Sequence, residues 1–118
     1  MAVGRAPTQD YGSACHPGAL LRQIVLPALN LTISQAAQDL MITRQSLHRI
    51  LAGRAAITPE MSLRLERFCG VSSRFWLERQ HDYEVQHARA SFSDTLAKIP
   101  ARPLPESVMD RIRAADGR

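Results

Sequence analysis

Residues 33–51, with the sequence ISQAAQDLMITRQSLHRIL, decide the fold of this chain. In the first half, Ala36, Ala37 and Leu40 form the narrow apolar stripe of a short amphipathic helix. In the second half the same helical spacing returns, with an apolar stripe made of Leu47, Ile50 and Leu51. A threonine directly precedes each half, and a threonine oxygen caps the first free amides of a helix. The stretch therefore predicts two short helices joined by a tight turn.

The second of these helices carries a polar face opposite its apolar stripe. That face consists of Arg44, Gln45, His48 and Arg49, at positions i, i+1, i+4 and i+5. Arginine offers paired donors to guanine, and a carboxamide pairs with adenine in the major groove. This is the pattern of a helix-turn-helix whose second helix contacts DNA. The alternative is an ordinary solvated helix face.

Length and composition favour one small all-α domain. The chain has 118 residues, 45% of them hydrophobic and 5% aromatic, without the alternating runs of a sheet protein. Its net charge is +4, and +3 of this lies in the first 54 residues, which hold five basic and two acidic side chains. Such a surplus beside the polar helix is expected of a nucleic-acid binder, although a small net charge also keeps an ordinary domain in solution.

Other classes of protein lack support in the sequence. Neither CxxC nor HExxH spacing occurs, and there is no glycine-rich phosphate loop, so we expect no enzyme activity, cofactor or metal. The longest apolar run, residues 24–29, is far shorter than a membrane span. With only two cysteines and no recognisable signal peptide, we expect a cytoplasmic protein with reduced thiols.

The remaining segments predict a five-helix domain over residues 16–90. Residues 1–15 are polar and contain glycine and proline, so we expect a mobile arm. Pro17 suits the first position of an opening helix, and Pro27 disfavours continued helix at Leu26. Asn30 can then take the left-handed conformation that lets the chain turn. Fourth and fifth helices are predicted to start at the caps Thr58 and Ser72.

Residues 91–118 form a C-terminal extension. Prolines at positions 100, 103 and 105 indicate a linker, and residues 106–115 suit one short helix. Just before this extension, Trp76 and Tyr83 lie seven positions apart on one side of the predicted fifth helix. We hypothesise that this side joins two protomers; the alternative is that both rings complete the core of one chain.

Residues 16–84 resemble a known family. The matching elements are HPG, LPAL, SQAA, RQSLHRILAGRAAITPEMSLRL and FW, in this order. In combination they are similar to the HigA family of antitoxins, within the Xre/Cro-like, or lambda-repressor-like, helix-turn-helix group. The likeness covers about 70 of the 118 residues and leaves out the arm and the extension.

The resemblance implies a function. HigA proteins are antitoxins of type II toxin-antitoxin modules: homodimers that bind an inverted-repeat operator in double-stranded DNA, repress their own promoter and neutralise a HigB toxin, a RelE-like ribonuclease. An alternative is a stand-alone Xre-type transcriptional regulator without a toxin. A further alternative is an adaptor that keeps the fold and binds only protein.

Carried over by position, the resemblance also implies the DNA-contacting residues. They are Ser34 and Gln35 at the start of the second helix, Thr43, Arg44, Gln45, Ser46, His48 and Arg49 in the third, and Arg54 in the following loop, where it suits a phosphate. One position departs from the family. Met41 stands where most relatives have glycine, and a side chain at positive φ there costs about 1 kcal/mol.

Overall fold

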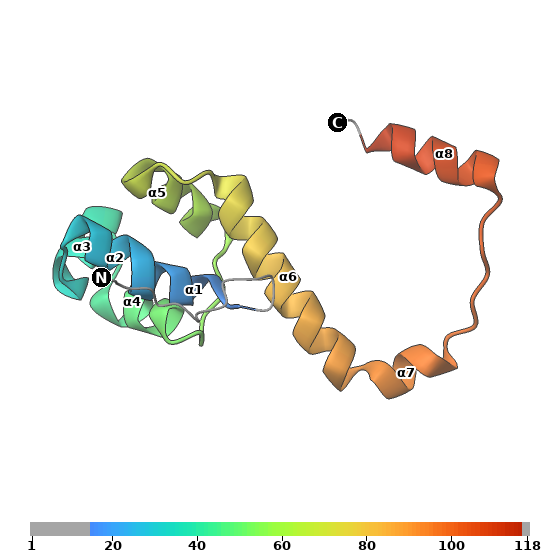
Figure 1. Ribbon diagram of the computed structural model, residues 1–118, viewed down its shortest axis with the longest axis horizontal. Coiled ribbons are helices and arrows are strands. Elements are labelled where there is room, and N and C mark those ends of the chain that lie inside the picture. The colour runs from blue at the N-terminus through green and yellow to red at the C-terminus, as the bar shows by residue number, and fades with distance from the viewer. Residues whose placement is uncertain (1–14, 117–118) are drawn as a thin grey trace, which may run out of the picture.

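The computed structural model describes residues 15–116, and all of the regular structure in this range is helical (Figure 1). The elements are α1 (Pro17–Leu20), η2 (Leu21–Val25), α2 (Leu26–Leu29), α3 (Ile33–Leu40), α4 (Arg44–Leu51), α5 (Pro59–Cys69), α6 (Ser73–Ser91), α7 (Ser93–Lys98) and α8 (Glu106–Ala115). Since α1, η2 and α2 follow one another without a break, they form the first of the five helices predicted for residues 16–90, and α3 to α6 form the others. The predicted arm, apart from Cys15, lies outside the described residues.

The first helix continues through Pro27, where the sequence disfavoured it. Element η2 is a π-helical turn, in which the Leu26 N–H donates to the Leu21 carbonyl five residues back. This widened turn places Pro27 in the first turn of α2, where a missing amide proton leaves no gap in the hydrogen-bond ladder. The helix ends instead after Leu29. Asn30 then adopts the predicted left-handed conformation, with φ 56°.

The predicted helix starts are confirmed by their caps. The hydroxyls of Thr32, Thr43, Thr58 and Ser72 accept hydrogen bonds from the backbone N–H three residues on, at 3.0–3.2 Å. At Thr32 the bond is reciprocal, because the Gln35 side chain accepts from the Thr32 N–H at 3.0 Å. Local sequence therefore fixes where α3, α4, α5 and α6 begin.

A single core holds together the five helices from the first helix to α6, residues 17–91, which we call the body. Each helix of this body contributes side chains to it: Leu20, Leu21, Leu26, Ala36, Ala37, Leu40, Leu47, Ile50, Leu51, Ile57, Met61, Leu65 and Trp76. The inward stripes predicted for α3 and α4 are all among them. The polar Gln80 is also buried, where its side chain accepts a hydrogen bond from the Ile57 N–H at 2.9 Å and so ties α6 to the loop before α5.

The side of α6 that carries Trp76 faces this core. Trp76 is only 1% exposed, and its indole N–H donates to the Val71 carbonyl at 3.2 Å. Tyr83 is half-buried with its ring edge-on to His16, the ring centroids 4.8 Å apart. Trp76 therefore completes the core of one chain, and the prediction that it lies on a surface between protomers is wrong. Helical spacing put the two rings on one side but could not tell which neighbour that side meets.

Beyond the body, the chain differs from a plain linker. Helix α6 extends past the other helices, α7 follows it after a bend at Phe92, and α8 stands apart from the body (Figure 1). Helix α8 has the bounds predicted for it, whereas α7 was not predicted. None of the helices described between residues 15 and 116 has the length and apolar character to cross a membrane.

Gly18 lets the first helix touch α4 through the backbone. A Cβ at Gly18 would lie 1.9 Å from the Ile50 carbonyl oxygen, which belongs to α4. Real Cβ atoms do not come this close, so any side chain at position 18 must push the two helices apart. This contact fixes how α4 lies against the first helix.

We expect Gly18→Ala to destabilise the chain by about 1–3 kcal/mol, as overpacking of a tight contact does. Helix propensity alone would change stability in the opposite direction, by about 1 kcal/mol. The measurement is urea unfolding followed by circular dichroism, with Ala28→Gly at an exposed site of α2 as the comparison. A stability equal to or above that of the unmodified chain would show that Gly18 is not a contact point.

Met41 adopts the left-handed conformation that the turn between α3 and α4 requires, with φ 59°. A glycine there avoids the steric conflict of Cβ, so we expect Met41→Gly to raise the stability of the monomeric chain by about 1 kcal/mol. For a domain of about this size that is a rise of roughly 4–8 °C in melting temperature. Asn30→Gly is the matched control: its φ is similar but asparagine tolerates the region, so its gain is smaller. A fall in the melting temperature of Met41→Gly at low protein concentration contradicts this explanation.

Candidate nucleic-acid interface

Helix α4 presents its polar face to solvent. Leu47, Ile50 and Leu51 are buried on the inner side. All nine residues predicted to contact DNA are exposed: Ser34, Gln35, Thr43, Arg44, Gln45, Ser46, His48, Arg49 and Arg54. The first two lie in the first turn of α3, six lie in or at the cap of α4, and the last lies in the loop after α4. The structure therefore leaves every one of them accessible to a ligand.

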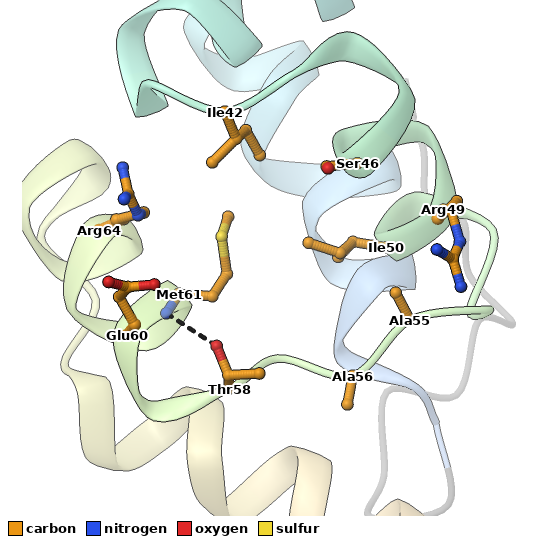
Figure 2. Close-up of a pocket in the computed structure, with 10 residues that line it drawn as sticks. All are labelled: Ile42, Ser46, Arg49, Ile50, Ala55, Ala56, Thr58, Glu60, Met61 and Arg64. Carbon is orange, nitrogen blue, oxygen red and sulfur yellow. Dashed lines mark hydrogen bonds between the residues drawn. The ribbon is translucent and has the colours of Figure 1, made fainter.

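The loop arginine lies beside α4. Arg54 lines a shallow hollow of about 270 Å³ together with Gln45, His48, Arg49 and Ala52. Figure 2 shows the Arg49 side chain directed away from Met61 and toward the loop at Ala55. Residues from α4 and from the following loop thus form one continuous surface.

Three of the predicted residues also have structural roles. The Gln35 amide oxygen and the Thr43 hydroxyl both serve the helix caps, and the Thr43 hydroxyl donates to the Ser46 hydroxyl at 2.8 Å. These bonds hold small polar groups in place at the amino ends of α3 and α4. Backbone amides at helix amino ends favour anions such as phosphate oxygens.

The positive charge of this surface is not neutralised within the described chain. The ion pairs among residues 15–116 join Arg74 to Glu78 and Arg113 to Glu106 and Asp110, all on α6 or α8. Arg44, Arg49 and Arg54 have no carboxylate partner in this part of the molecule. Unpaired guanidinium groups on a convex helix are suited to phosphates and to the acceptor edge of guanine.

Two other arginines hold the helices in position, and sequence reasoning missed both. Arg22 donates to the Leu51 carbonyl at the end of α4, at 2.6 Å. Arg64 donates to the Leu40 carbonyl at the end of α3, at 2.8 Å, and more weakly to that of Met41. A cation at the carboxyl end of a helix satisfies free carbonyls and opposes the helix dipole. The partners lie 29 and 24 positions apart, so no local pattern indicates them.

A hollow of about 240 Å³ separates α4 from α5 (Figure 2). The buried side chains of Ile50 and Met61 form its apolar floor, and Arg64 and Glu60 lie on the α5 side. Within residues 15–116, histidine, cysteine and carboxylate side chains do not gather in any group of three that could hold a metal ion. The exposed face of α4 remains the best candidate site.

Comparison with known proteins agrees with this geometry. A family profile described as helix-turn-helix matches residues 21–76, the region from η2 to Trp76. Virulence-associated protein A of Dichelobacter nodosus is 35% identical over 94 residues, which cover 79% of this chain and 92% of that protein. The solved structure of an addiction module antidote protein of the HigA family from Coxiella burnetii is 28% identical, with a TM-score of 0.70 over 76% of this chain and 98% of its own. The chain belongs to the Xre-like helix-turn-helix family.

A second HigA relative was solved with DNA. The Pseudomonas aeruginosa antitoxin HigA, determined with the higBA promoter, is 25% identical, and the match covers 78% of this chain and 99% of that one with a TM-score of 0.70. Almost the whole of each solved relative matches about three quarters of this chain. The remaining quarter of the chain has no counterpart in those two structures.

The HPG motif at residues 16–18 begins with His16, which has a structural role. Its Nδ1 accepts a hydrogen bond from the Gly18 N–H at 2.9 Å and caps the first helix. The His16 ring also forms a hydrogen bond with the backbone of Ala55, the residue that follows Arg54. Burial lowers the pKa of His16 below its ordinary value of 6.5, against smaller upward effects of the Ala55 bond and of Glu84. The neutral ring therefore links the first helix to the loop that carries Arg54.

Acid should weaken this link. Because the folded pKa is lowered, the unfolded chain binds more protons around pH 6.5, so this contribution to stability is present above pH 6.5 and is lost as the pH falls below it. We expect His16→Asn, which keeps a capping side chain, to reduce the fall in melting temperature between about pH 7.5 and about pH 5.5. His81→Asn, at an exposed position of α6, serves as the control. An identical pH dependence in the unmodified chain and His16→Asn would exclude this role.

Proposed function

We propose that this chain is the antitoxin of a type II toxin-antitoxin module. In this proposal it binds an inverted-repeat operator as a homodimer, represses its own promoter and neutralises a HigB-like, RelE-like ribonuclease. The DNA-binding half is supported chiefly by one observation: α4 is held from behind by buried contacts, while its outward face carries arginine and glutamine side chains without carboxylate partners. The relative solved with promoter DNA supports the same assignment.

The residues divide into two roles. Arg44 and Gln45 lie in the first turn of α4 and His48 one turn further, the region that enters the major groove and contacts base edges in helix-turn-helix proteins. Ser34, Gln35, Thr43 and Ser46 cluster at helix amino ends, where they suit phosphate oxygens. Arg49 and Arg54 flank this region and complete the phosphate contacts. Two copies related by a twofold axis place their α4 helices in successive major grooves, about 34 Å apart.

The toxin half of the proposal is supported by the likeness to solved HigA antitoxins and is tested at the native operon. The chain is tagged and purified from cells that express the operon, and the neighbouring protein is also produced alone. We expect the neighbour to co-purify, to arrest growth and degrade messenger RNA when alone, and to be silenced by this chain. Operator binding without any such neighbour would contradict the antitoxin assignment and leave a stand-alone Xre-type regulator.

Arg44→Ala and Arg54→Ala should weaken operator binding in different ways. Loss of a base contact at Arg44 should cost about 1–3 kcal/mol on the operator and relax specificity at one base pair. Loss of a phosphate contact at Arg54 should weaken operator and random DNA alike and lower the slope of log K against log salt by about one. Fluorescence anisotropy with operator and scrambled duplexes over a range of salt concentrations measures both.

Arg89→Ala, on the exposed part of α6 beyond the body, is the matched control for loss of one positive charge. It should leave both the operator affinity and the salt slope close to those of the unmodified chain. If Arg44→Ala reduces affinity for operator and scrambled DNA equally, Arg44 does not contact a base.

A further inference from the structure

Helix α8 has an apolar face that the rest of residues 15–116 covers only in part, since Val108 and Met109 are half-buried. Val108, Met109 and Ile112 share one side, and Ile112 is 55% exposed. The helix stands apart from the body in Figure 1. Its ten residues are too few for a stable isolated helix in water, which needs about 12–15 residues even in favourable sequences. The helix therefore requires a surface to pack against.

The connector before α8 keeps it away from its own body. Residues 99–105 form no regular structure and include Pro100, Pro103 and Pro105. Proline fixes φ and makes such segments extended, semi-rigid spacers rather than flexible hinges. A connector of this kind presents α8 outward.

The body has an uncovered apolar hollow of its own, between α3 and α5. It measures about 390 Å³ and is lined by Leu40, Met41, Leu63 and Phe68. Met41 is 81% exposed and Leu63 60% exposed. An exposed apolar side chain held at positive φ is doubly unfavourable in an isolated chain, and such strain is typical of positions that serve a contact.

The charges around the two surfaces match. Asp39, Glu60 and Arg67 lie on the rim of the hollow and have no ion-pair partner among the described residues. At 100° per residue, Arg111 and Glu106 lie on opposite borders of the α8 apolar stripe. Glu106 is already paired with Arg113 at 3.5 Å, so Arg111 is the cation beside the stripe that suits Asp39 or Glu60 on the rim of the hollow.

We propose that α8 of one copy occupies the α3–α5 hollow of a second copy, and the reverse. Each chain offers both the helix and the hollow, and residues 15–116 leave the hollow open and the helix face partly exposed, which is the condition for a closed twofold exchange. The hollow shares no residue with the nine proposed DNA contacts, so the exchange leaves α4 free. This inference rests on the homodimer of the proposed function, and it assigns α8 as the segment that connects the two protomers.

Disulfide trapping between two differently tagged variants tests the exchange. Both carry Cys15→Ser and Cys69→Ala; one then carries Met41→Cys and the other Met109→Cys. After mixing and mild oxidation of the full chains, we expect a cross-linked heterodimer containing both tags and loss of most free thiol. The matched control pairs Met41→Cys with Ser107→Cys on the opposite side of α8, and it should cross-link only weakly.

Three outcomes overturn the proposal. The first is no cross-link above the control, and the second is a cross-link formed only between two copies of the Met109→Cys variant. The third is an intramolecular disulfide in a chain that carries both Met41→Cys and Met109→Cys, which would mean that α8 folds onto its own body. Operator binding is measured on every mixture: binding without the cross-link contradicts the exchange alone, and the cross-link without binding contradicts the proposed function alone.

The exchange also changes what Met41→Gly does. The substitution relieves the backbone but removes a side chain from the hollow. It should therefore stabilise the monomer at high dilution and raise the concentration at which sizing chromatography shows half of the chain as dimer. An unchanged dimer concentration dependence would overturn the role of Met41 in the exchange.

Discussion

Helix α4 takes its direction from a contact between two backbones. The Cα of Gly18 lies so close to the Ile50 carbonyl that no other residue fits, and this fixes the separation of the first helix and α4. The neighbouring residues serve the same contact. His16 caps the first helix through the Gly18 N–H, and Pro17 is buried at its first position. The HPG motif thus sets the position of α4 although none of its residues lies on the outward face of that helix.

Contacts with the backbone also hold the two helices of the helix-turn-helix at their carboxyl ends. Arg22 holds the carboxyl end of α4 and Arg64 holds that of α3, both through backbone carbonyls. These bonds satisfy the free ends of two eight-residue helices that are too short to be stable alone. Because the supports act on inner stripes and carboxyl ends, the amino ends and the outward face of α4 stay available for a ligand. A well-positioned surface needs this arrangement, since base contacts tolerate little error in helix placement.

How much the sequence predicts follows from the range of each interaction. Caps, apolar stripes and left-handed turns depend on residues within a few positions, so Thr32, Thr43, Asn30 and the bounds of α8 could be predicted. The π-helical turn before Pro27 could not be predicted in this way. The local rule for proline indicates a helix break, but the widened turn removes the hydrogen bond that the proline would otherwise interrupt. The tertiary partners of Arg22 and Arg64 could not be predicted either, because they are distant in sequence and no periodic pattern indicates them.

Trp76 is a residue whose position on a helix could be predicted from the sequence but whose packing partner could not. Its place on α6 was predictable, but the wide apolar arc at the start of that helix did not tell whether the ring faces the core or a second chain. Packing against the body settles this, because the ring fills the core beneath the Val71 carbonyl. The DNA contacts remain a prediction from exposure and charge, since the accessibility of all nine side chains permits contact without demonstrating it.

The most direct test of the account is methylation protection on the native promoter, which reports contacts to guanine N7 in the major groove. If α4 contacts base edges in a twofold dimer, the bound chain protects guanines in two clusters whose centres lie about 10 base pairs apart on one face of the duplex. Protection confined to minor-groove adenines, or binding without any guanine protection at guanine-containing half-sites, would contradict the claim that the outward face of α4 contacts DNA.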